Sequence, residues 1–207
     1  MRTSIASAGS MDPRSIEFPF RLHVPRTEGA LADLIRALGF SCIRCGECCR
    51  AKSGDEHLVL VSPDEVREIA VAGGGSWESV AEPFPCFTPH GSAGSHTFEW
   101  CLRREGDRCR FLRERGGFPA CSVYLSRPWI CRTYPFVLEG EDLLVYPCPG
   151  LSRAEATMEA EAMAADLLAR QCFEREEEER VRKVFEGSPL PQGRVVIDGD
   201  GMKVLHG

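Results

Sequence analysis

Apolar residues recur at helical spacing in three stretches of the chain. The first, residues 27–39, begins with an N-cap threonine and ends at a glycine, so it predicts a helix. The second, residues 62–71, opens with a serine, a proline and two acidic residues, which is the signature of a capping box at a helix start. The third, residues 152–185, predicts a long helix that begins with a second capping box, formed by Ser152 and Glu155.

Short apolar runs between polar turns predict the strands. One strand is expected at residues 57–61. Hairpins are expected at residues 98–112, 133–146 and 195–205, and each turns at a polar segment that contains glycine. Residues 73–95 are rich in Gly, Ser and Pro and predict turns and loops without periodic structure.

These elements predict an α+β fold with short hairpins and helices and a long C-terminal helix. Residues 1–26 lack a sustained period and are expected to form a poorly ordered arm, in which Met11 is a second candidate start of translation. Residues 27–150 are expected to form one small cysteine-rich domain, and residues 151–207 the C-terminal helix and terminal hairpin. A chain of 207 residues is long enough to bury a core.

Charge and hydropathy argue against two classes of partner. A net charge of -6 and a pI near 5.5 do not provide the basic footprint of a nucleic-acid-binding protein. No stretch reaches transmembrane length, and residues 1–10 lack the apolar core of a signal peptide. We therefore expect a cytoplasmic protein with no nucleic-acid or membrane partner. In such a reducing compartment, 11 cysteines indicate metal binding instead of disulfides.

Four of the cysteines fall within residues 42–49. Their spacing is Cys-x-x-Cys-x-x-Cys-Cys, and cysteines three residues apart let a tight turn aim two sulfurs at the same ion. Gly46 supplies the backbone freedom that such a turn requires. The alternative interpretation, that these thiols are buried small hydrophobic residues, is disfavoured by their density.

Four further cysteines lie in short downstream motifs, among them Arg-Pro-Trp-Ile-Cys-Arg-Thr-Tyr-Pro-Phe at residues 127–136 and Cys-Pro-Gly at residues 148–150. With these motifs and the CxxCxxCC run, residues 39–150 resemble the YkgJ-like cysteine-cluster family, also called the CxxCxxCC domain, which is regarded as chelating zinc or iron. The resemblance implies that eight cysteines bind metal: Cys42, Cys45, Cys48, Cys49, Cys109, Cys121, Cys131 and Cys148.

Eight thiolates suffice for two four-coordinate centres, either structural zinc sites or cubane iron–sulfur clusters. Cys48 and Cys49 are neighbours whose side chains tend to diverge, so we expect them to serve different centres or different edges of one. A remote Cys148-Pro149 after a CxxCxxC run parallels bacterial ferredoxins and favours iron–sulfur over zinc by a small margin. Arginines near the ligands are interpreted either as solvated residues or as support for thiolate charge: Arg44, Arg50, Arg110, Arg127 and Arg132.

The remaining cysteines and the motif aromatics receive other roles. Four residues have the types of a Cys2His2 zinc site, but their spacing matches no zinc finger and favours an ordinary loop: Cys86, His90, His96 and Cys101. Cys172 is expected to be a packed thiol in the long helix. Tyr134 and Phe136 are expected to be core residues around the centre, and Cys131 to lie in the first turn of a helix.

Three functions follow as hypotheses. The first is a metal-binding protein that chelates iron, as iron–sulfur, or zinc through up to eight cysteines. The second is a metal-dependent enzyme related to flagellin lysine methylases, although the sequence shows neither a methyl-donor glycine loop nor a Ser-His-Asp set. The third is an adaptor with a structural zinc site that binds a protein partner through the acidic run at residues 176–179, which is otherwise a solvated face.

Overall fold

The computed structural model describes residues 19–50, 58–152 and 159–205. The described helices are α1 (Glu28–Ala37), α2 (Pro63–Gly73), α3 (Trp77–Val80), α4 (Trp129–Thr133) and α5 (Glu159–Gly187), with 3-10 turns η2 (Glu47–Cys49) and η3 (Tyr124–Ser126). The described strands are β1 (Phe20–His23), β2 (Leu60–Val61), β3 (Ala81–Pro83), β4 (Thr88–Pro89), β5 (Gly94–Thr97), β6 (Trp100–Leu102), β7 (Arg104–Glu105), β8 (Arg108–Cys109), β9 (Leu112–Arg115), β10 (Phe118–Cys121), β11 (Phe136–Glu139), β12 (Asp142–Val145), β13 (Gly193–Asp198) and β14 (Gly201–Leu205).

The strands form several small sheets, which confirms the predicted α+β class. Two sheets have three strands each, in the orders β1-β12-β11 and β2-β6-β3. A third has the order β14-β13-β5-β4, and its β13–β5 pair is parallel. The pairs β7–β8 and β9–β10 are separate hairpins.

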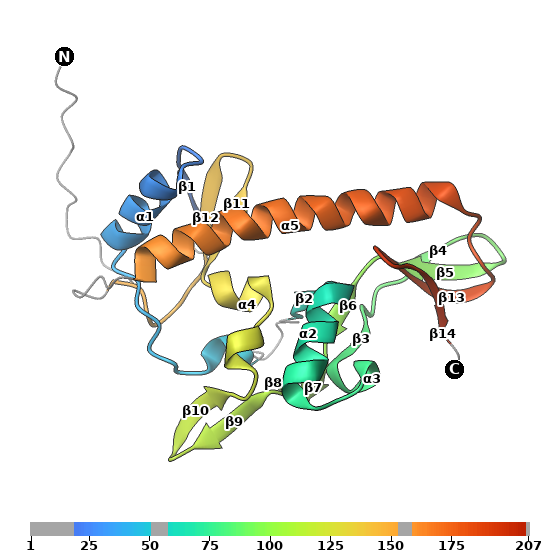
Figure 1. Cartoon of the computed structure of the whole chain (residues 1–207), viewed down its shortest axis with the longest axis horizontal. Helices are drawn as coiled ribbons and strands as arrows, with labels where there is room; N and C mark the ends of the chain where they lie inside the picture. Colours follow the sequence, from blue (N-terminus) through green and yellow to red (C-terminus); the bar gives the residue numbers. More distant parts are fainter. Residues whose placement is uncertain (1–18, 51–57, 153–158, 206–207) are drawn as a thin grey trace.

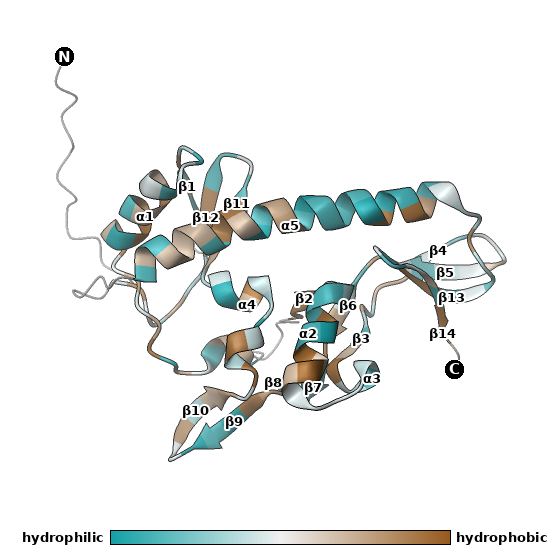
Figure 2. Ribbon diagram, viewed as in Figure 1, coloured by the Kyte–Doolittle hydropathy of each residue, from teal (hydrophilic) through white to brown (hydrophobic). Residues whose placement is uncertain are grey.

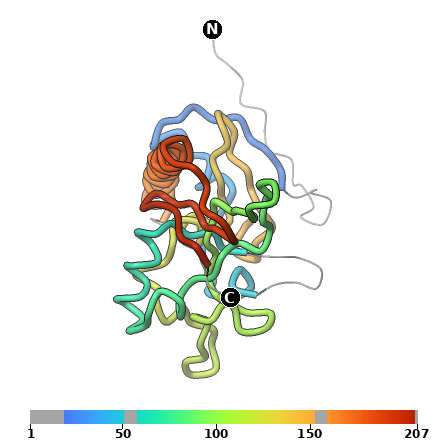
Figure 3. Tube along the Cα trace, turned by 90° about the vertical axis from the view of Figure 1, so that its right-hand side faces the viewer, coloured from blue at the N-terminus to red at the C-terminus, as the bar shows by residue number. Residues whose placement is uncertain are grey.

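Helix α5 spans the length of the molecule and links its two ends (Figure 1). One end holds α1 and the β11–β12 hairpin, and the other holds β13, β14, β4 and β5. Helices α2 and α3 lie below α5, and the β9–β10 hairpin projects from the lower side. Figure 3, which looks along α5, shows β13 and β14 folding back beside it.

The first hydrophobic core lies between α1, the β11–β12 hairpin and the first half of α5. Leu31, Phe136 and Leu143 are fully buried in it, and the Phe40 ring packs edge-on against Phe136 with centroids 5.2 Å apart. Helix α5 contributes a stripe of apolar residues that includes Leu167. The middle of α5 beyond this stripe is mostly hydrophilic (Figure 2), so only its first half serves this core.

The second core gathers α2, the β2-β6-β3 sheet and the segment after β8. Val66 and Ile69 of α2 are fully buried, and Phe111 packs with them. The Trp77 and Trp100 rings meet edge-on at 5.3 Å. Because Val196 of β13 also belongs to this core, the C-terminal hairpin is an integral part of the fold.

Several predicted elements are confirmed. Helix α1 starts after Thr27, whose hydroxyl accepts from the Ala30 N–H at 3.3 Å, and α2 starts with the capping box of Ser62 and Glu65. The hairpins β11–β12 and β13–β14 and the long helix α5 are also present. The second predicted capping box depends on Glu155, which lies outside the described residues.

Expectations for three segments are wrong, at residues 20–23, 73–95 and 98–112. Phe20–His23, in the segment expected to be poorly ordered, forms β1 against β12. Residues 73–95, expected to be loops, contain α3, β3, β4 and the start of β5. The turn predicted within residues 98–112 is present, because β7 pairs with β8 around Gly106 and Asp107, but the hairpin is shorter than expected, since β6 pairs with β2 and β3 instead. The strand expected at 57–61 is β2, and the hairpin expected from residue 133 starts at β11, after α4.

Candidate metal centre

The CxxCxxCC run turns sharply at Gly46 and lies against the β9–β10 hairpin. Gly46 has a left-handed backbone conformation, with φ of 73°, and the Cys49 N–H donates to its carbonyl at 3.1 Å. A Cβ added at Gly46 would lie 2.7 Å from the Cβ of Pro119 on β10. Glycine is therefore required here both by the backbone conformation and by the close approach of the hairpin.

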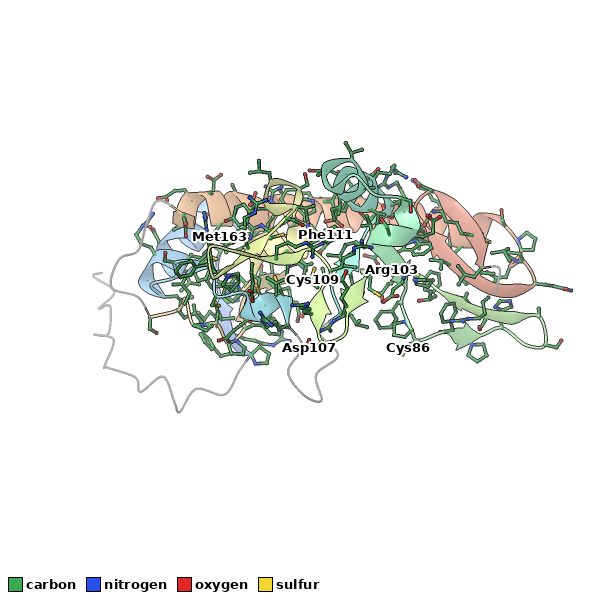
Figure 4. The ribbon with its side chains drawn as sticks, turned by 90° about the horizontal axis from the view of Figure 1, so that it is seen from below. Cys86, Arg103, Asp107, Cys109, Phe111 and Met163 are labelled. Carbon is green, nitrogen blue, oxygen red and sulfur yellow. The ribbon has the colours of Figure 1, made fainter. Side chains whose placement is uncertain are left out.

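Cys109 is brought to this turn by a backbone bridge. Arg50, directly after Cys49, pairs antiparallel with Arg108, directly before Cys109. Cys48, Cys49 and Cys109 line a common cleft beside β6 and β7. Figure 4 shows Cys109 near the middle of the molecule, well inside the two ends of α5.

Cys121 and Cys131 approach from two further elements. Cys121 is the last residue of β10, the strand against which Gly46 packs. Cys131 lies in the first turn of α4, as predicted, and its N–H donates to the Pro128 carbonyl at 2.9 Å. The Arg127 guanidinium donates to the Cys131 carbonyl at 3.4 Å, which places a fixed positive charge beside this helix.

The loop that carries Cys148 packs on the opening of the CxxCxxCC run. The Ser41 N–H donates to the Gly150 carbonyl at 2.9 Å, and a Cβ at Gly150 would lie 2.4 Å from the Ser41 carbonyl oxygen. Next to this contact, the Cys42 N–H donates to the Glu159 carboxylate at the start of α5, at 3.4 Å. Cys42 and Cys148 are therefore brought together by direct backbone packing.

The thiols act on one another electrostatically in two overlapping sets. In the first set, burial raises the pKa of Cys131, and the nearby Cys109, Cys48 and Cys121 raise it further. A hydrogen bond between the Cys48 and Cys49 thiols lowers the pKa of Cys48 to about 7 and raises that of Cys49. Burial also raises the pKa values of Cys109 and Cys121. These five sulfurs therefore act on one another, although the Cys48 side chain is exposed and the other four are only partly buried.

The second set surrounds Cys148. Burial, with a further contribution from Cys45, Cys48 and Cys42, raises the pKa of Cys148 to about 11. Burial raises the pKa of Tyr134 as well, and the thiols of Cys148, Cys48 and Cys45 add to that shift. Cys48 thus acts on both sets and lies between them.

We call Cys49, Cys109, Cys121 and Cys131 the β8 group, and Cys42, Cys45 and Cys148 the Cys148 group. Thiols that raise one another's pKa values retain their protons unless a cation offsets the negative charge of the thiolates. Arg127 supplies part of this charge, since it lowers the pKa values of Cys48, Cys121 and Cys131. A bound metal ion would supply far more, because a coordinating thiol is deprotonated outright.

The donor set fits a thiophilic metal. Sulfur ligands without carboxylates suit zinc and iron–sulfur clusters and do not suit magnesium or calcium. Within the part of the chain that the structure describes, no three His, Cys, Asp or Glu side chains converge closely enough to hold an ion as they stand. Chelation would therefore require the thiols to converge further than they do in this structure.

The four residues of the alternative Cys2His2 site do not converge as a metal site in the part of the chain that the structure describes. The Cys101 thiol is buried and donates to the Glu82 carbonyl at 3.5 Å. The Nδ1 atoms of His90 and His96 contact each other at 3.4 Å. Cys86 is exposed and lies apart from Cys109 in Figure 4.

The prediction for Phe136 is confirmed, whereas the prediction for Cys172 is not. Phe136 is fully buried in the first core, as predicted, and Tyr134 is partly buried beside the Cys148 group. The prediction of a packed Cys172 is wrong, because its side chain is exposed. It lies off the stripe of α5 that faces the protein, which consists of Ala160, Ala164, Leu167 and Arg170.

Sequence reasoning missed the residues that fix α4. The sequence predicts the Glu65 carboxylate only as a capping-box partner, yet one of its oxygens accepts from the Trp129 N–H at 2.8 Å. Arg170 is 8% exposed and donates to the Thr133 hydroxyl at 2.9 Å. An arginine within the apolar stripe of α5 was the one sequence signal for this contact.

The fold and the site together define a cysteine-rich α+β protein in which separate segments that carry motif cysteines pack against the run at residues 42–49. It belongs to the CxxCxxCC family, described as "Putative zinc- or iron-chelating domain", whose model matches residues 41–172. That match contains all eight motif cysteines and ends within α5. No curated protein and no solved structure matches the chain. Among the described helices, none has the length and apolar character needed to cross a membrane.

Proposed function

We propose that this protein holds two metal centres through its eight motif cysteines. The β8 group would ligate one centre, and the Cys148 group together with Cys48 would ligate the other. The observation that carries this proposal is the packing of the CxxCxxCC run between two sets of partners. Its Gly46–Cys49 side lies against β8 and β10, and its Ser41–Cys42 side lies against the Cys148 loop.

An iron–sulfur cluster is the form that we favour, with zinc as the alternative. Cys42, Cys45 and Cys48 with a remote Cys-Pro at residue 148 partly parallel the ligands of one cluster in bacterial ferredoxins, although Cys49 directly after Cys48 departs from the ferredoxin spacing. An all-thiolate centre carries a charge of about -2 whether it holds zinc or an oxidised cubane, so nearby cations stabilise it. Arg127 and Arg44 both lie over the Tyr124 ring, 3.9 and 5.2 Å from its centroid, and each is close in sequence to a proposed ligand.

We assign this chemistry to a reducing compartment such as the cytoplasm, where cysteines remain available as metal ligands. A protein with two such centres is suited to electron transfer or to metal delivery. One residue of the acidic run argues against the adaptor hypothesis. The Glu177 carboxylate accepts from the Gly199 N–H and forms an ion pair with Arg180, so it already has partners within this chain. A methylase activity would be tested by methyl-donor binding.

The proposal is tested by measuring iron, zinc and acid-labile sulfide in anaerobically purified protein and in three serine variants. Cys45→Ser and Cys131→Ser should each lower the bound metal and the melting temperature, because metal ligation contributes folding free energy, on the order of 10 kcal/mol per structural zinc in peptide systems. Cys172→Ser is the matched control and should change neither, since its thiol is exposed and distant in sequence from the motifs.

The same variants test the division into two centres. Each motif variant should lose about half of the metal, and the double variant Cys45→Ser/Cys131→Ser should lose nearly all of it. Loss of all metal in one single variant would indicate one shared centre and refute the division. Full metal content in both single variants would refute the choice of ligands.

A further inference from the structure

Helix α4 is a single turn that carries one of the motif cysteines, and its first residue is fixed by a side chain from α2. The Glu65 carboxylate accepts from the Trp129 N–H at 2.8 Å through one oxygen and from the Ser62 N–H at 2.9 Å through the other. One carboxylate thereby joins the first turns of α2 and α4. These contacts are half-buried, so water competes weakly for the two N–H groups.

The other end of α4 is fixed by α5. The buried Arg170 guanidinium donates to the Thr133 hydroxyl at 2.9 Å, and that hydroxyl donates to the Trp129 carbonyl at the same distance. Arg132 forms an ion pair with Asp166 at 2.7 Å. An isolated turn of five residues is not stable by itself, because one or two hydrogen bonds do not offset the cost of ordering it. The position of α4 therefore depends on these contacts.

We propose that Glu65 is a positioning residue for the metal ligand Cys131, acting through α4. This inference rests on the proposed function, since it takes Cys131 to be a ligand. Cys131 lies two residues after Trp129 in the same helical turn. The hydrogen bond from the Trp129 N–H to Glu65 therefore fixes the position of the Cys131 thiol relative to the rest of the β8 group. Residues that orient a metal ligand through a hydrogen bond commonly change metal affinity 10- to 100-fold when they are replaced.

The test is the rate at which EDTA removes iron and zinc from the anaerobically purified full chain. Glu65→Ala loses both acceptor oxygens and should raise that rate about 10-fold. Glu65→Gln keeps one acceptor oxygen and should raise the rate by less. Glu68→Gln is the matched control, because Glu68 is an exposed residue of the same helix, and its rate should equal that of the unmodified protein.

Two further variants separate positioning from general destabilisation. Val195→Ala removes buried methyl groups in β13, a strand that carries no cysteine, and should lower the melting temperature without changing the EDTA rate. In a Cys131→Ser background, Glu65→Ala should add no further change to the rate, because the ligand through which it acts is absent. A purely structural role would instead leave the Glu65→Ala effect intact in that background.

The outcomes distinguish this inference from the proposed function. If Cys131→Ser loses metal while the Glu65 variants behave like Glu68→Gln, the positioning role is refuted and the ligand set stands. A lower melting temperature in Glu65→Ala without a faster EDTA rate refutes it as well. If Cys131→Ser keeps its full metal content, the proposed ligand set is wrong and this inference falls with it.

Discussion

Replacing Asp198 by alanine should destabilise the protein, although residue 198 lies beyond the segment that matches the family model. Asp198 is 1% exposed, and its carboxylate accepts from the Trp100 indole N–H at 2.7 Å and from the Asp200 N–H at 3.0 Å. The Lys203 ammonium also pairs with it. The carboxylate thus ties the C-terminal hairpin to the strand at the centre of the β2-β6-β3 sheet.

The magnitude follows from what each partner loses. The Trp100 side chain is buried, so its unsatisfied N–H costs about 1–3 kcal/mol. The Lys203 side chain is 35% exposed and rehydrates, so that ion pair contributes about 1 kcal/mol or less. Together with the weakened turn at Asp200, the loss should be about 3 kcal/mol. For a chain of this size that lowers the melting temperature by about 6–12 °C.

Urea unfolding of the metal-loaded protein, followed by tryptophan fluorescence and far-UV circular dichroism, measures this loss. Asp198→Asn keeps an acceptor for Trp100 and should cost about 1 kcal/mol. The metal content of both variants should equal that of the unmodified protein, because the hairpin carries no cysteine. The reasoning is refuted if Asp198→Ala changes the unfolding free energy by less than about 0.5 kcal/mol, or if the asparagine variant is equally destabilised.

Two further predictions concern the cysteine turn and an ion pair. Gly46→Ala should lower both the metal content and the stability, by about 1–2 kcal/mol for the left-handed backbone alone and by more for the Pro119 contact. Gly29→Ala is the control and should lower neither, because the added Cβ would meet no neighbouring group within 4 Å. Equal behaviour of the two variants would contradict the turn geometry. Arg67 holds the pKa values of Asp64 and Asp200 below their usual range, so these two carboxylates bind fewer protons in the folded protein than in the unfolded chain. The stability that they contribute is present above about pH 4 and is lost as the pH falls through their folded pKa values. Arg67→Gln should therefore flatten the acid limb of a stability–pH profile, and an unchanged slope would refute this.

The elements that sequence predicts correctly are those whose signals are local. The capping box of Ser62 and Glu65 marks the start of α2 within four residues, and the hairpins β11–β12 and β13–β14 have their turns between their own strands. By contrast, β5 has only four residues and depends on its parallel pairing with β13. A Cβ at Gly94 would lie 1.9 Å from the Gly193 carbonyl oxygen, so that glycine serves a partner distant in sequence.

The sequence predicts the residues of the candidate site but not how they are grouped. Spacing and resemblance indicate the eight cysteines, but their grouping depends on contacts such as that between Ser41 and Gly150, which sequence does not reveal. The role of Glu65 toward α4 spans 64 positions and was equally hidden. Cys172 is expected to be buried in the long helix but is exposed. Helical spacing indicates that a segment is a helix more reliably than it indicates which face of that helix is buried.

The central claim is that the eight motif cysteines hold iron or zinc in two centres. Its most direct test is the content of iron, zinc and acid-labile sulfide per chain in the anaerobically purified protein, with the absorption spectrum recorded on the same sample. We predict stoichiometric metal for two centres and favour a brown protein with labile sulfide, with a colourless protein carrying two zinc ions as the alternative. A folded protein that contains neither metal, and takes up neither when it is supplied anaerobically, would show that these cysteines are not metal ligands.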